Sequence, residues 1–222
     1  MTVEVVDTAK IPGGGHLQLL RRGTDFSIVL GDDELMGSRA SHSEKTLAIL
    51  ACRRMAPYHG NILIGGLGMG FTLGAALSVL PKTSKIVVAE LMPQILRWAE
   101  GPLAHLFGKS LTDPRLFLDM RDVHDLIDEA EGVFDGIILD VDNGPDGFMC
   151  AENERLYSAW GLRAAYAALR PTGVLAIWSA YPDDDFVKRL CTAGFVVEEL
   201  TVPDAEMGQR AMHTIWLAAK PR

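Results

Sequence analysis

The chain has 222 residues with 29 acidic and 21 basic side chains, which give a formal net charge of −8. Because no basic block stands out, the composition argues against a DNA or RNA backbone as the main partner. A hydrophobic content of 48% is ample for one compact domain with a real core. The three cysteines, Cys52, Cys150 and Cys191, lack paired spacing, so they indicate neither a disulfide framework nor a zinc site.

The sequence shows neither a recognisable targeting signal nor a membrane-spanning segment. The first residues lack a basic region followed by an apolar stretch, and the longest apolar runs are far shorter than a membrane span. We therefore expect a cytoplasmic protein that acts on a small molecule, with neither a membrane nor a nucleic acid as its partner.

The first 40 residues read as a small β segment that precedes a larger domain over residues 41–222. The runs Leu17–Leu20 and Phe26–Leu30 flank the turn Arg22–Asp25, which predicts a β-hairpin. Glu34–Met36 could add a third short strand. A helix follows over residues 44–50, with Ser41 or Ser43 as its N-cap.

From residue 61 onward, apolar runs alternate with helical patterns, which predicts βαβ units and a parallel sheet. The predicted strands are Ile62–Ile64, Ile86–Ala89, Leu116–Leu118, Gly136–Leu139, Val174–Trp178, Phe195–Leu200 and His213–Ala218. The predicted helices are Phe71–Leu80, Pro93–Trp98, Val123–Ala130, Asn153–Leu169 and Asp184–Ala193.

The last two predicted strands have no helix between them and read as an antiparallel pair. By analogy, that ending is typical of the class I methyltransferase fold. We therefore expect an α/β, Rossmann-like architecture: a mostly parallel seven-stranded sheet that ends in an antiparallel pair, with a small N-terminal β-hairpin segment.

A glycine-rich turn is the most informative motif. The run Ile62–Ile64 ends in a turn that is followed at once by a helical pattern, and the turn contains Gly65, Gly66, Gly68 and Gly70. A strand, a glycine turn and a helix in this order typically place backbone without side chains against a nucleotide-like ligand. The glycines could instead allow the helix to pack closely against the strand. Glu90 ends the next apolar run, where an acid suits a ribose hydroxyl; it could also cap the following helix.

Further acids follow the other strands, where ligands bind in open parallel sheets. Asp119 and Asp122 follow the third strand, and Asp140 and Asp142 follow the fourth. Each could also be a turn or cap residue, since Asn143-Gly144-Pro145 is strong turn chemistry. The six histidines lack metal-ligand spacing, and neither a nucleophile elbow nor a Walker lysine is present, so we expect no metal and neither acyl nor phosphoryl transfer.

From about residue 23 to its end, the chain resembles the spermidine synthases. Their glycine turn is similar to Gly65–Gly70, their acid after strand two matches Glu90, and their acid beside adenine matches Asp119. Their Asp-rich loop after strand four resembles Asp140–Pro145, and a small N-terminal β segment is also a feature of the family. Leu156-Tyr157 and the turn Leu169-Arg170-Pro171-Thr172-Gly173 match as well.

The resemblance implies a sulfonium nucleoside donor, either S-adenosylmethionine or its decarboxylated form. The glycines would face the donor tail, Glu90 the ribose, and Asp119 with Met120 the adenine. Asp140 would lie near the sulfonium and, with Asp142, is a candidate for catalysis. A homodimer is implied by the resemblance alone.

The segments that correspond to the acceptor-binding part of the spermidine synthases differ in this chain. Tyr-Gln-Glu is replaced by His42-Ser43-Glu44, the acidic pair before it by Ser38-Arg39-Ala40, and Ile-Pro-Thr-Tyr-Pro is reduced to Val202-Pro203. We therefore expect alkylation of a small amine, with methyl transfer or an unusual acceptor favoured over authentic spermidine synthesis. A catalytically inactive nucleoside-binding regulator and a nicotinamide oxidoreductase are the alternatives.

Overall fold

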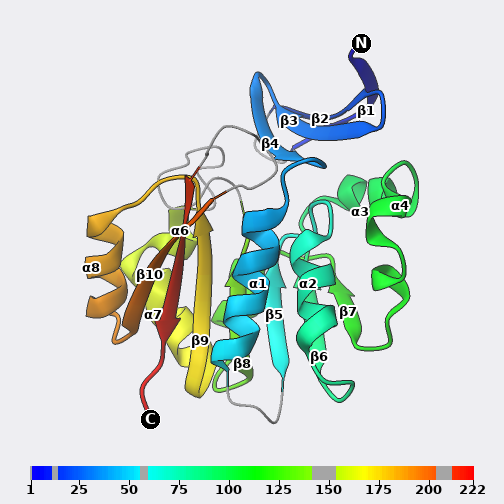
Figure 1. Cartoon of the computed structure of the whole chain (residues 1–222). Helices are drawn as coiled ribbons and strands as arrows, with labels where there is room; N and C mark the ends of the chain where they lie inside the picture. Colours follow the sequence, from blue (N-terminus) through cyan, green and yellow to red (C-terminus); the bar gives the residue numbers. More distant parts are fainter. Residues whose placement is uncertain (1, 12–14, 56–59, 142–153, 204–211) are drawn as a thin grey trace.

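The chain forms two β-sheets, a small antiparallel one and a large one flanked by helices. The computed structural model describes residues 2–11, 15–55, 60–141, 154–203 and 212–222. The small sheet lies across the end of the large sheet at which the parallel strands terminate (Figure 1). That position makes it the cover of the edge where ligands bind in folds of this type.

The N-terminal sheet has four strands in the order β1-β2-β3-β4. The predicted hairpin is confirmed as β2 (His16–Arg22) and β3 (Asp25–Leu30), whose register pairs Leu17 with Leu30. The third strand is β4 (Asp33–Gly37). The first strand, β1 (Glu4–Lys10), was not predicted; it is exposed at the sheet edge and a bulge between Val5 and Asp7 breaks its alternation.

The large sheet has seven strands in the order β10-β11-β9-β8-β5-β6-β7, which confirms the predicted architecture. The neighbours from β9 to β7 run parallel, whereas β11 is antiparallel to both β9 and β10. Its strands are β5 (Asn61–Gly65), β6 (Lys85–Ala89), β7 (Leu116–Asp119), β8 (Phe134–Leu139), β9 (Leu169–Ser179), β10 (Val196–Pro203) and β11 (Met212–Ala219).

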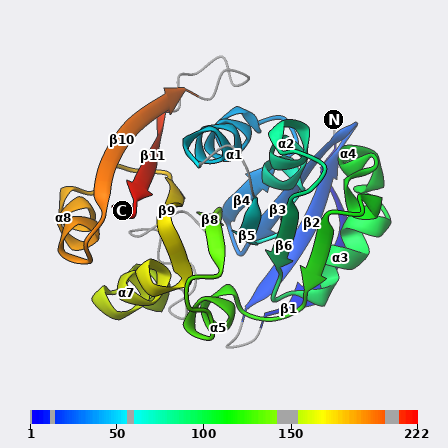
Figure 2. The same cartoon turned by 90° about the horizontal axis from the view of Figure 1, so that it is seen from below.

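Helices cover both faces of the large sheet, and each face has its own buried cluster (Figure 2). One cluster contains residues of α1 (His42–Arg54), α2 (Phe71–Val79) and α3 (Pro93–Glu100), together with residues of the N-terminal sheet. The other contains residues of α5 (Val123–Asp128), α7 (Ala159–Ala168) and α8 (Asp184–Thr192). The short elements are α4 (Ala104–Phe107), η1 (Ser110–Thr112) and α6 (Glu154–Tyr157).

The helix predicted over Asn153–Leu169 is wrong as a single element. Asn153 lies outside the described residues, and the rest of the pattern is divided at Ser158 into α6 and α7. The backbone of Ser158 is extended, and its hydroxyl accepts a hydrogen bond from the Gly161 amide at 3.1 Å. A serine with that geometry starts a new helix, because it satisfies one of the amides that have no partner within the helix.

The N-terminal sheet is fastened to the large domain through a buried indole. Asp7 Oδ2 accepts a hydrogen bond from Trp98 Nε1 at 2.8 Å and another from Gln94 Nε2. These bonds lower the pKa of the Asp7 carboxyl, with the bond from Trp98 as the largest cause. Trp98 is 2% exposed, and Asp7 is the acceptor that its N–H has in the structure.

Replacement of Asp7 by alanine should lower the free energy of unfolding by about 1–3 kcal/mol, because it leaves the Trp98 N–H buried without its acceptor. Urea denaturation followed by fluorescence measures this loss. Asp32→Ala, at an exposed position in the turn before β4, is the control and should change stability by less than about 0.5 kcal/mol. Equal losses in both variants would contradict the anchoring role of Asp7.

Candidate functional site

The switch point of the large sheet lies between β5 and β8. From β5 the chain builds β6 and β7 on one side and then returns to place β8 on the other side. The carboxyl ends of β5 and β8 therefore meet, and the glycine turn lies against the residue that follows β8. A Cβ added to Gly66 would be 3.0 Å from the carbonyl oxygen of Asp140. Ligands bind in such crevices in open α/β sheets.

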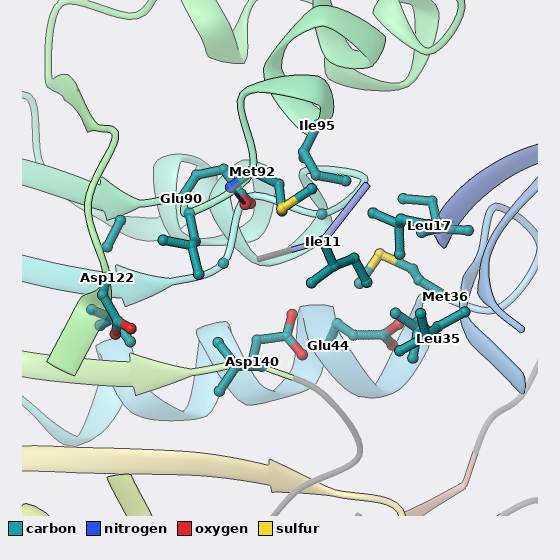
Figure 3. Close-up of a pocket in the computed structure, with 18 of the residues that line it drawn as sticks. Ile11, Leu17, Leu35, Met36, Glu44, Glu90, Met92, Ile95, Asp122 and Asp140 are labelled. Atoms are coloured by element: carbon teal, nitrogen blue, oxygen red, sulfur yellow. Dashed lines mark hydrogen bonds between the residues drawn. The ribbon is translucent and has the colours of Figure 1, made fainter. Parts of the chain in front are cut away.

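A cavity of about 200 Å³ opens at this switch point. Of the predicted site residues, Gly66, Gly68, Glu90 and Asp140 line it. Figure 3 shows Glu90 and Asp140 on two sides of the cavity, with apolar side chains from the N-terminal sheet opposite them. That apolar wall consists of Leu17, Ile28, Leu30, Leu35 and Met36 of the sheet, together with Ile11, which follows β1.

The glycine turn satisfies its amides inside the protein. Gly66, Gly68 and Gly70 all have positive φ, a conformation that favours glycine. This path directs the turn's N–H groups toward protein acceptors. The bonds run from Gly66 N to Ala89 O (2.8 Å), Leu67 N to Glu90 Oε2 (2.9 Å), Met69 N to Met36 Sδ (3.2 Å) and Gly70 N to Leu67 O (2.8 Å).

Glu90 has the capping role that its position suggested and also lines the cavity, while its contact with a ribose stays a prediction. Its Oε1 accepts a hydrogen bond from the amide of Met92, the N-cap residue of α3, while its Oε2 accepts the bond from Leu67. Burial raises the pKa of the Glu90 carboxyl, and the amide hydrogen bonds oppose that rise. The carboxylate therefore caps a helix entry and also forms part of the cavity wall.

Asp140 directly follows β8 and lies at the N-terminus of α2. Thr72 Oγ1, in the first turn of that helix, donates a hydrogen bond to Asp140 Oδ2. Burial raises the pKa of the Asp140 carboxyl to about 6, although the bond from Thr72 acts in the opposite direction. A carboxylate at this position already complements the positive end of the helix dipole.

Asp119, the last residue of β7, and Asp122, which follows the strand, occupy different positions. Asp119 forms an ion pair with Arg121 (Oδ1–Nε 3.1 Å) and does not line the cavity; the neighbouring Met120 is 38% exposed. Asp122 does line the cavity, and its Oδ1 caps α5 by accepting from the His124 amide at 2.8 Å. The adenine-binding role of Asp119 and Met120 stays a prediction.

Two of the predicted glycines fit the alternative interpretation that a glycine allows close packing of neighbouring elements. A Cβ on Gly65 would lie 3.2 Å from side chains of Leu139 and Val123, and one on Gly70 would lie 2.3 Å from the ring of Phe107. Neither glycine lines the cavity, so contact with a donor stays a prediction for both. Asp142, the other predicted catalytic residue, and the turn 143–145 lie outside the described residues.

Besides the apolar wall, four residues that contribute to the site were not predicted there. Glu44 and Trp178 line the cavity, Met36 covers the glycine turn, and Thr72 holds Asp140. Only Glu44 had a local signal, because it lies in the segment that corresponds to the family's Tyr-Gln-Glu. The other three depend on contacts between distant parts of the chain.

In the part of the chain that the structure describes, every charged side chain that lines the cavity is acidic. Glu44, Glu90, Asp122 and Asp140 line it, and no described Lys, Arg or His does. Asp122 is paired with Arg155, whereas the bonds to Glu90 and Asp140 come from neutral amides and a hydroxyl. The described residues contain no cluster of three acids, histidines or cysteines fit for a metal, and no described helix could span a membrane.

The comparisons with known proteins confirm the fold inferred from the sequence. No protein-family model and no curated protein sequence matches the chain. The spermidine synthase of Thermotoga maritima superposes with a TM-score of 0.79 at 17% identity, over 97% of this chain and 72% of that one. A spermidine synthase in complex with the transition-state analogue AdoDATO gives 0.81 at 17% identity, over 97% and 73%.

A third structure extends the same likeness. A probable spermidine synthase from Corynebacterium glutamicum superposes with a TM-score of 0.64 at 14% identity, over 98% of this chain and 80% of that one. At identities this low the likeness establishes the spermidine synthase-like fold, and the chemistry has to be argued from the cavity itself.

Asp140→Asn should stabilise the protein at pH 8 but not at pH 4. The folded-state pKa near 6 exceeds the ordinary 3.8, so the ionised carboxylate opposes folding above pH 6 and the neutral acid does not below pH 3.8. The shift corresponds to a gain of up to about 3 kcal/mol at pH 8. Urea denaturation at both pH values measures it, with Asp128→Asn at an exposed position as the control. A gain that is equal at both pH values would contradict the raised pKa.

Proposed function

We propose that the protein is a transferase that binds a cationic sulfonium nucleoside in this cavity and transfers a carbon group from it to a small amine. The observation that carries the proposal is the pair of carboxylates of buried Glu90 and half-buried Asp140, both held by neutral donors alone. Buried carboxylates are costly unless a positive charge compensates them. A cationic ligand would supply that charge.

The same cavity is unfavourable for anionic ligands. A dinucleotide places its pyrophosphate on turn amides and on a helix N-terminus. In this protein four amides of the glycine turn already donate to protein acceptors, and the N-terminus of α2 faces the carboxylate of Asp140. This arrangement supports a sulfonium donor over a nicotinamide dinucleotide.

The reaction would be a displacement at the carbon attached to the positive sulfur. The amine lone pair forms the new C–N bond, the C–S bond breaks, and its electron pair neutralises the sulfonium to give a thioether nucleoside. The amine proton passes to a carboxylate, and a pKa near 6 suits Asp140 for that role close to neutral pH. Glu90 would bind the ribose hydroxyls, Asp119 and Met120 the adenine, and Asp142 would act beside Asp140.

The charges of the cavity favour the decarboxylated donor. S-adenosylmethionine carries a tail carboxylate, which would meet Glu90 and Asp140 without a described cation to pair with. Decarboxylated S-adenosylmethionine lacks that group and has only positive charges. The finer assignment we propose is thus aminopropyl transfer, while the methyl transfer favoured from the sequence remains the competing prediction. The altered Ser38–Glu44 segment still favours an acceptor other than putrescine.

Calorimetry with four nucleosides tests the proposed donor. We expect decarboxylated S-adenosylmethionine to bind most tightly, S-adenosylmethionine and methylthioadenosine to bind more weakly, and NAD not to bind. Asp140→Asn should reduce the affinity for the decarboxylated donor by at least about tenfold, because a charge-assisted contact is lost. Binding of NAD alone would refute the proposal, and donor binding without turnover on any amine would favour the regulatory alternative.

The pH profile of turnover tests the proposed base. With a panel of amines and release of methylthioadenosine as the readout, kcat/KM should rise with pH and reach a plateau above about 6, the pKa of Asp140. Asp140→Asn should lose this limb and at least about a hundredfold in rate. If the variant keeps full turnover and the same profile, another group is the base.

A further inference from the structure

One neutral side chain from the N-terminal sheet closes over the glycine turn. Met36 lies in β4, more than thirty residues before the turn, and its Sδ accepts a hydrogen bond from the Met69 amide at 3.2 Å. Its Sδ and Cε both lie 3.0 Å from the position that a Cβ on Gly68 would occupy. The thioether therefore fits into the space that glycine leaves open, and Figure 3 shows its side chain facing the cavity.

This contact occupies the place where a donor tail would meet the turn, an argument that rests on the proposed function. A tail carboxylate needs an N–H group or a cation nearby, since an unpaired buried anion is costly. The Met69 amide is the turn donor that points to the N-terminal sheet, and a sulfur atom, a weak acceptor, already takes it. A stronger carboxylate acceptor could replace the sulfur only if the Met36 side chain moved away.

We propose that Met36 is a specificity-determining residue that lets the cavity accept a donor tail without a carboxylate and reject one that carries it. Glu90 and Asp140 repel every anion in the cavity, but their substitution would also remove the charges that attract the donor. Met36 is uncharged, so its substitution changes the space and the free amide at the turn while the charges stay the same. The contribution of Met36 to selectivity can therefore be measured separately.

The experiment compares the ratio of the Kd of S-adenosylmethionine to the Kd of its decarboxylated form in three proteins. Met36→Ala removes both the bulk and the sulfur, and the ratio should fall by about tenfold, the effect of one hydrogen bond to a charged group. Met36→Leu keeps most of the bulk and loses the acceptor, so the ratio should fall by less, about threefold. Methylthioadenosine, which has no charged tail, measures how much each variant weakens nucleoside binding in general.

A matched control separates this role from a general loss of packing. Leu35→Ala removes another cavity-lining side chain of β4, one that is not among the nearest neighbours of the turn glycines, and it should leave the ratio unchanged. If Met36→Ala changes the ratio by less than about twofold, or weakens all nucleosides alike, the role of Met36 is overturned and the proposed function stands. Met36→Leu gives the same decision if the alanine variant does not fold.

Two further outcomes keep the two proposals distinguishable. If the unmodified protein binds both donors with equal affinity, there is no selectivity for Met36 to provide, and the inference fails while a sulfonium site remains. If the unmodified protein binds neither donor nor methylthioadenosine, the proposed function itself is refuted, and the specificity role of Met36 is refuted with it.

Discussion

The hydrogen bond from Thr72 to Asp140 is the interaction on which the character of the site depends. It fixes a carboxylate at the N-terminus of α2, where nucleotide-binding folds commonly accept a phosphate. The helix dipole is thereby complemented by the protein's own anion. Because burial raises the pKa of this carboxyl, the arrangement keeps a group at the centre of the site that gains from a nearby cation and can take up a proton close to neutral pH.

The N-terminal sheet makes the other half of the cavity wall apolar. Its strands bring apolar side chains over the carboxyl ends of β5 and β6, so the carboxylates of Glu90 and Asp140 face a wall of low polarity. An apolar wall excludes water and strengthens the electrostatic interactions within the cavity. The small sheet therefore determines how strongly these carboxylates act, although it contributes none of them.

The strand-end residues could be predicted from sequence because their signals are local. An apolar run followed by glycines, or by a single acid, identifies the carboxyl end of a strand, and the topology then brings Gly66, Glu90 and Asp140 together. The positions of Asp119 and Asp122 were harder to separate from the sequence, since Asp119 ends β7 and Asp122 follows it only three residues later. The start of α5 decides which of them caps the helix beside the cavity.

The remaining residues depend on packing between distant segments, which a pattern along the chain does not reveal. Nothing in the sequence around Met36 indicates that it reaches the turn near Gly68, and the hydroxyl of Thr72 is one of many in a helical pattern. Likewise, β1 alternates poorly because of its bulge, so the strand that carries Asp7 has no clear period. Tertiary contacts override local signals in all of these places.

The pairing of β5 with β8 has a consequence for how the protein is made. These strands lie side by side, with Ile62 opposite Gly136, yet about seventy residues of chain separate them. During synthesis the ribosome must release the whole β6–β7 half before the glycine turn can meet Asp140. Loop closure over such a separation is slow compared with local helix formation. One edge of β5 in the nascent chain therefore stays without its partner strand until β8 has been synthesised, and the binding cavity cannot be completed before then.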